Sequence, residues 1–135
     1  MIKKILLLVF VGAVGTSLYV YLQYNKPHQD IASTKPVATL KADELFFQFE
    51  DNELESNQLY LGKIVEVSGV VYSNEKGQDG SYNVLLMSDD AMFGVACNFE
   101  IDSLSELEKG DSVTIKGECA GMLSDVVLIR CVIVK

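Results

Sequence analysis

The sequence predicts a small, mainly-β domain built on a five-stranded barrel, with one helix before the strands and a short helix between the third and fourth. Three observations support this fold. Residues 109–134 alternate apolar and polar side chains on both sides of a turn near Ser124-Asp125. Three earlier runs rich in β-branched and aromatic residues are separated by turn-forming segments. Period-2 alternation of this kind is typical of half-buried strands, and the last two form a hairpin.

An uncharged apolar run precedes the domain. Residues 5–22 contain 18 residues without a charge, and as a helix they would extend about 27 Å, close to the hydrocarbon thickness of a bilayer. Lys3 and Lys4 favour a cytoplasmic N-terminus and an exported domain. We therefore predict a transmembrane anchor over residues 1–24. A cleavable signal peptide is the alternative, because Ala13-Val14-Gly15 resembles a cleavage site, but the apolar run continues past it.

Residues 25–39 contain both prolines of the chain and show little periodicity, which predicts an extended linker. The predicted barrel domain therefore covers residues 40–135. Its first part, residues 40–59, has a helical pattern in which Leu45, Phe46 and Phe49 share one face. Core packing is the ordinary role for these side chains.

The strands come after the helix in a characteristic order. Residues 63–73, 82–88 and 92–99 are predicted as the first three, and Gly69 suggests a bend or bulge in the first. Residues 101–108 are predicted as the short helix before the final hairpin. In that hairpin Val113, Ile115, Gly117 and Cys119 share the inward face of one strand, and Val127, Ile129, Cys131 and Ile133 that of the other. This element order predicts an OB-fold, a Greek-key barrel.

Several short motifs also resemble a known family. They are Asn52-Glu53, Asn57, Tyr60 and Gly62-Lys63 leading into VEVSGVV, followed by GVAC, KGDSVTIKGECAG and DVVLIRC. Together and in this order they are similar to the tRNA_anti-like OB-fold family of small bacterial envelope proteins. The resemblance covers residues 40–134 and implies an OB barrel, but it carries no catalytic residue over to this chain. Asn52, Asn57 and Tyr60 are expected to join the helix to the first strand.

The charge of the chain disfavours nucleic acid as a ligand. From residue 25 onward there are 9 Lys and Arg against 19 Asp and Glu, a balance of about ten negative charges. Lys76 is the only base between Lys63 and Lys109. Single-strand binding by an OB barrel needs a basic groove and exposed aromatic side chains, for which the candidates are Tyr72, Tyr82, Phe93 and Phe99. Nucleic-acid binding is therefore the alternative function rather than the first choice.

No catalytic, cofactor or metal site is predicted. The chain has three cysteines without a C-x-x-C motif and a single histidine, His28, in the linker. The pair Asp89-Asp90 sits in a turn without a histidine to complete a site. In the alternating pattern of their strands, the cysteines fall on the same side as the core residues, so they are expected to be buried.

Two of the cysteines are candidates for a disulfide. If the last turn consists of residues 124–126, Cys119 lies opposite Cys131 at a distance that a disulfide can bridge. If the loop spans residues 120–125, the two are about 16 Å apart along the strands and no bond forms. Because an exported domain meets an oxidising compartment, we expect the Cys119–Cys131 bond, with Cys97 as a free buried thiol.

The predicted function is that of a non-enzymatic binding module, anchored to the membrane and exposed on the extracytoplasmic side of the bacterial envelope. Its partner is expected to be a protein, peptide or glycan. The expected contact surface is the outer barrel face between the loop of residues 74–81 and the hairpin tip, with Tyr72, Tyr82, Met122 and Leu123 as contact residues. Met122 and Leu123 form an apolar pair that is unusual at a turn, although both could instead tuck under the end of the barrel.

Overall fold

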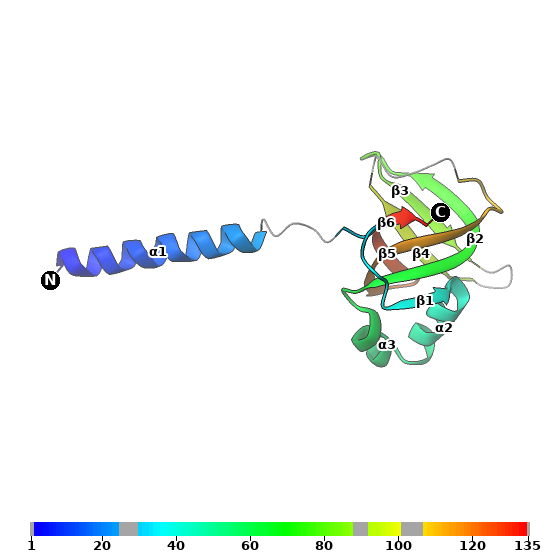
Figure 1. The fold of residues 1–135 in the computed structure, drawn as a ribbon, viewed down its shortest axis with the longest axis horizontal. Helices are drawn as coiled ribbons and strands as arrows, with labels where there is room; N and C mark the ends of the chain where they lie inside the picture. Colours follow the sequence, from blue (N-terminus) through cyan, green and yellow to red (C-terminus); the bar gives the residue numbers. More distant parts are fainter. Residues whose placement is uncertain (1, 25–29, 88–91, 101–106, 135) are drawn as a thin grey trace.

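The computed structural model describes residues 2–24, 30–87, 92–100 and 107–134 (Figure 1). Within them a barrel is preceded by helices. The elements are α1 (Ile2–Tyr24), β1 (Ala38–Lys41), α2 (Ala42–Asp51), α3 (Glu53–Tyr60), β2 (Ile64–Lys76), β3 (Tyr82–Leu86), β4 (Val95–Phe99), β5 (Ser112–Met122) and β6 (Val126–Ile133). The predicted helix over residues 101–108 falls mainly on residues outside the described ranges.

The sheet closes on itself. Its strand order is β1-β2-β3-β4-β6-β5, and β2 also pairs with β5, which completes a five-stranded barrel from β2 to β6. The pair β4–β6 is parallel, while the other pairs within the barrel are antiparallel. The mainly-β prediction of a five-stranded barrel is therefore confirmed, and its inward face carries the core side chains Val67, Leu86, Phe99, Ile115 and Leu128.

β2 changes partners along its length. Ile64 to Val70 pair with β5, and from Val71 onward the strand pairs with β3, with a register shift between Val71 and Ser73. The irregularity thus lies at Tyr72 rather than at Gly69. Gly69 has a different role, because a Cβ there would stand 3.0 Å from Cβ of Ala42 in α2. The missing side chain allows α2 to pack closely across the barrel.

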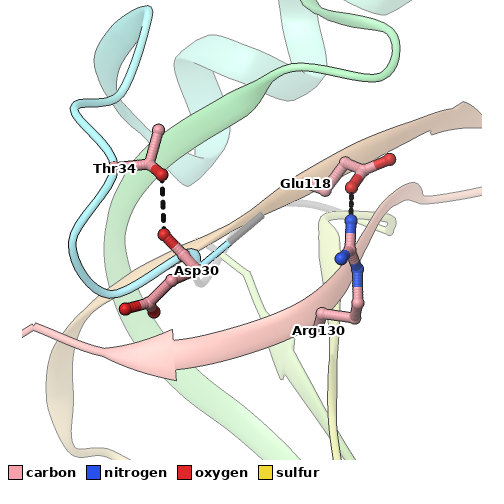
Figure 2. Close-up of polar contacts among 4 residues, drawn as sticks. All are labelled: Asp30, Thr34, Glu118 and Arg130. Atoms are coloured by element: carbon pink, nitrogen blue, oxygen red, sulfur yellow. Dashed lines mark hydrogen bonds and ion pairs between the residues drawn. The ribbon is translucent and has the colours of Figure 1, made fainter. Parts of the chain in front are cut away.

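The segment before α2 is bound to the barrel, so the predicted linker of residues 25–39 is too long. Ile31 is buried, and Thr34 donates a hydrogen bond from Oγ1 to the carbonyl of Asp30 at 2.6 Å (Figure 2). The ammonium group of Lys116 on β5 donates to the carbonyls of Ala32 and Thr34. Alternation could not reveal this turn, because main-chain carbonyls make most of its contacts.

β1 was also absent from the prediction. It runs parallel to the first half of β2, with Ala38 opposite Val65 and Lys41 opposite Ser68. Four residues are too few to show a clear alternation, and the prolines nearby resemble those of a linker. The ordered domain therefore starts ahead of residue 40.

The predicted helix of residues 40–59 is two helices. Asn52 ends α2 and caps α3: its side chain accepts a hydrogen bond from the Glu55 backbone N–H and donates one to the Glu55 carboxylate. The Asn52 side chain is therefore the N-cap of α3, and an asparagine at this place favours a helix start. As Figure 1 shows, α2 and α3 lie together at one end of the barrel.

α1 forms over the stretch that was predicted as the anchor, Ile2–Tyr24. Within the described residues, the structure contains no helix with both the length and the apolar character needed to cross a membrane.

The close packing of α2 on β2 gives a first prediction. Gly69→Ala should destabilise the domain by about 1–3 kcal/mol, because the new methyl group meets Ala42 at 3.0 Å and Leu86 at 3.3 Å. Ala42→Gly removes one of these contacts, so the double variant should lose less stability than the sum of the single variants. Urea denaturation of the four proteins measures this coupling. Additive losses would show that the contact with Ala42 is not the cause.

Candidate functional site

The outer face of β3 and β4 is the surface on which OB barrels bind oligonucleotides and oligosaccharides. Here its outward side chains are Asn83, Leu85, Ala96 and Asn98, between the inward residues of the same strands. The amide of Asn98 donates to Oδ1 of Asn83 at 3.0 Å. These four side chains include neither a cation nor an aromatic ring, which are the groups from which single-strand binding sites are built.

The two predicted contact tyrosines differ in orientation. Tyr82 has the parity of Val84 and packs against the core, with the Lys76 ammonium 5.3 Å from its ring centroid. Tyr72 is on the outside of β2, 48% exposed, with the Lys109 ammonium 4.4 Å from its ring centroid. Tyr72 is therefore available at the surface, and Tyr82 only in part.

The two residues predicted as contacts at the hairpin tip, Met122 and Leu123, also differ in exposure. Met122 packs against the core, while Leu123 is 87% exposed. The tip is far from Tyr72, because β5 begins opposite Val70 and ends beyond Ile64, a length of roughly 20 Å. The four predicted contact residues are thus not brought together in one site.

An aromatic group of which the sequence indicated only Phe93 as a surface residue lies beside α2. The ring of the buried Phe46 stacks on Phe93, with centroids 6.4 Å apart, and meets Phe47 edge-on at 5.9 Å. Phe47 and Phe93 are 55% and 45% exposed. Phe47 lies off the buried stripe of α2, which Ala42, Leu45, Phe46 and Phe49 form. A phenylalanine outside the apolar stripe was the signal that could have revealed this surface.

Carboxylates surround the exposed Phe47. Glu44, Glu50 and Asp51 line, with Phe47 and Gln48, a shallow hollow of about 700 Å³ on the outer side of α2. Across residues 42–60 there are six Asp and Glu and no Lys or Arg. We call Glu44, Phe47, Glu50, Asp51 and Phe93 the acidic–aromatic face.

α3 holds this face in place. The Tyr60 hydroxyl donates to Oε1 of Gln48 at 2.7 Å, and Ser56 Oγ donates to the Gln48 carbonyl at 2.8 Å. Burial raises the pKa of Tyr60, and the negative charge of Glu44 raises it further. Tyr60 therefore remains a neutral hydrogen-bond donor and fixes α3 against α2.

The predicted opposition of Cys119 and Cys131 is wrong, because the turn lies one residue earlier than predicted and β5 and β6 contain two irregularities. The turn covers residues 123–125 instead of 124–126, with Met122 opposite Val126, and an extra residue between Cys119 and Gly121 places Cys119 opposite Leu128. A second shift occurs at Arg130, whose φ is 53°, and places Arg130 and Cys131 across from Gly117. The predicted inward pair Val127 and Ile129 was therefore also wrong, since Val126 and Leu128 are buried instead.

The three thiols are free and buried. Cys131 lies in the interior beside Gly117, where a Cβ would stand 2.7 Å from its Sγ. A hydrogen bond with Cys131, together with burial, raises the pKa of Cys97 well above its ordinary value, and burial raises that of Cys119. Protonated buried thiols are poor nucleophiles, so these cysteines act as small core residues. On the outer side, Arg130 forms an ion pair with Glu118 (Figure 2).

Fold and surface together define a small OB-fold domain whose usual ligand face is neutral and whose helical cap is acidic. The chain matches the tRNA_anti-like family over residues 1–133 and belongs to it. A comparison with curated proteins found no match. Among solved structures, the chain is similar to a lipoprotein from Klebsiella pneumoniae subsp. pneumoniae to which nucleic-acid binding is provisionally attributed. The TM-score is 0.55 at 22% identity, over 82% of this chain and 100% of the other. This likeness supports the fold.

The buried thiols give a second prediction. In the native protein at pH 8, iodoacetamide should leave Cys97, Cys119 and Cys131 unmodified, because all three thiols are buried and burial also raises the pKa of Cys97 and Cys119. In denaturant without a reductant, mass spectrometry should find all three modified. A pair that reacts only after reduction would show a disulfide and contradict this expectation.

Proposed function

We propose that this chain is a membrane-anchored binding module on the extracytoplasmic side of the envelope, without enzymatic activity, and that its partner is a protein or peptide. The observation that carries this proposal is the distribution of charge and aromatic side chains. The outer face of β3 and β4 offers Asn83, Leu85, Ala96 and Asn98. In contrast, the exposed ring of Phe47 adjoins carboxylates, and the exposed ring of Phe93 stacks on the neighbouring Phe46. Exposed aromatic side chains are enriched at protein interfaces.

The anchoring proposal rests on the N-terminal segment. Residues 5–22 carry no charge, and α1 is one continuous helix through them. Apolar side chains such as Val9, Phe10 and Leu18 are more than half exposed along it. We therefore base the anchor on this uncharged sequence, and the lysines at positions 3 and 4 favour export of the barrel domain.

The absence of catalysis is proposed from the state of the reactive groups. The thiols are buried, with raised pKa values for Cys97 and Cys119. Asp79 accepts hydrogen bonds from Ser81, which lower the pKa of its carboxyl and tie it to a turn. The thiols and the Asp79 carboxyl therefore serve packing and turn formation, and binding is the function that the surface supports.

The topology gives a third prediction. Protease added to intact spheroplasts should remove the barrel domain from full-length protein, because the domain lies outside the cytoplasmic membrane. Immunoblotting against a C-terminal tag measures this, with a cytoplasmic protein as the protected control. Full protection would contradict the exported topology. A mature N-terminus at Thr16 would contradict the uncleaved anchor.

Single-stranded nucleic acid is the second candidate function, because the fold favours it and two lysine–tyrosine contacts lie on β2 and β3. Lys109 stands over Tyr72 and Lys76 over Tyr82. A stacked ring beside a cation is the unit from which such sites are built. Against this, the whole chain carries a net charge of −8, which repels phosphate.

The fourth prediction decides between the two candidates. At physiological salt, full-length protein should not bind 20-nucleotide single-stranded DNA or RNA more tightly than about 100 μM, since few cations are available to release counterions. Fluorescence anisotropy with labelled oligonucleotides measures this. A micromolar dissociation constant that weakens with added salt would favour nucleic acid instead. The variant Lys76→Ala/Lys109→Ala would then show whether the lysine–tyrosine contacts form the site.

A further inference from the structure

We infer that the acidic–aromatic face docks a cationic amphipathic segment of a partner protein, with an apolar side chain against Phe47 and Phe93 and Lys or Arg side chains beside Glu44, Glu50 and Asp51. The inference rests on the proposed function and names the surface and the chemistry of the partner. It places the contact at the helical end of the barrel, away from the outer face of β3 and β4.

α2 carries apolar side chains on its outer face as well as on the face that packs against the barrel. Ala42, Leu45, Phe46 and Phe49 face the barrel and are buried, so the helix needs no further apolar residue to pack. Phe47 is nevertheless a large ring that is 55% exposed. A second half-exposed ring, Phe93 of the loop before β4, shares the buried Phe46 as its neighbour.

Phe46 also makes this aromatic group suitable for binding. Its ring contacts Phe47 edge-on and Phe93 by stacking, which restricts both exposed rings before any partner arrives. Rings that are held in place lose little conformational entropy on binding and are effective anchors. The hollow of about 700 Å³ beside Phe47 is open and shallow, as expected for a segment that lies across α2 rather than a small molecule.

The negative charge of the acidic–aromatic face determines which kind of partner can bind there. Residues 42–60 carry six carboxylates and no base, and the whole chain has a net charge of −8. A second copy of this chain would bring the same carboxylates to the contact, and a nucleic acid would bring phosphates, so both are repelled. A segment rich in Lys and Arg is attracted, and charge complementarity raises both its association rate and its specificity. Amphipathic helices of this kind bind through regularly spaced apolar anchors.

The test uses full-length protein in zwitterionic lipid nanodiscs, with empty nanodiscs as the blank. The probe is an 18-residue amphipathic Lys/Leu peptide with a fluorescent label, and its twin has Glu at every Lys position. The Lys peptide should bind with a measurable anisotropy change, and the Glu twin should not. Equal binding of the twins, or no binding of the Lys peptide, would overturn the inference.

Two variants with matched controls locate the contact. Glu44→Gln/Glu50→Gln/Asp51→Asn should weaken binding of the Lys peptide at least tenfold. Its control removes three exposed carboxylates elsewhere with the same change in net charge, Glu75→Gln/Glu100→Gln/Glu108→Gln, and should stay within twofold of the wild type. Equal losses from both triple variants would show a diffuse effect of net charge and overturn the assigned surface.

The aromatic contribution is tested separately. Phe47→Ser should weaken binding of the Lys peptide at least fivefold, whereas Leu123→Ser, at an even more exposed residue, should have little effect. Circular dichroism confirms that each variant is folded, and Phe93→Ser replaces Phe47→Ser if the latter does not fold. Displacement of the peptide by an oligonucleotide, or unchanged affinity in the phenylalanine variant that folds, would overturn the inference. The proposed function would survive that result if the protein partner bound through another surface.

Discussion

The pairing of β2 with three other strands is the constraint on which the barrel depends. Its first half bonds to β5 on one edge and to β1 on the other, and its second half bonds to β3. A strand of 13 residues can do this only if it coils around the core. Gly69 lies near the change of partner, and its missing side chain lets α2 cross close to β2. The position of α2, and with it the acidic–aromatic face, depends on this bend.

Much of the fold could be predicted because alternation is strong where one side of a strand is buried. The inward set of β5 was confirmed by Ile115 and Cys119. Prediction failed on β6, where an irregularity at Arg130 changes the side to which the next residues point. A bulge shifts the parity by one without a glycine or proline to indicate it, because Arg130 itself takes the positive φ. The disulfide expectation failed because the turn covers residues 123–125 instead of 124–126 and because both strands depart from a regular register.

The candidate site was harder to predict than the fold. Phe46 and Phe49 were recognised as core residues from their spacing, but the same pattern leaves Phe47 unassigned. Phe47 becomes part of a larger aromatic surface only because Phe93, which is distant in the sequence, stacks on Phe46. The four predicted contact residues were selected because of their residue types. The register of β2 and β5 places Tyr72 and Leu123 far apart. The local sequence indicates the chemistry of each side chain. A binding surface can be predicted only when the segments that lie side by side in the fold are also known.

β1 also covers part of the edge of β2. Without it, the main-chain groups of β2 between Val65 and Ser68 would form an open edge in a sheet rich in valine. Open edges of that composition recruit strands from other chains and begin aggregation. β1 covers that edge and replaces it with one only four residues long, which ends in the exposed Lys41. A short edge strand that ends in a lysine is a poor template for pairing with another strand. We therefore expect β1 to protect the barrel from strand pairing with other chains.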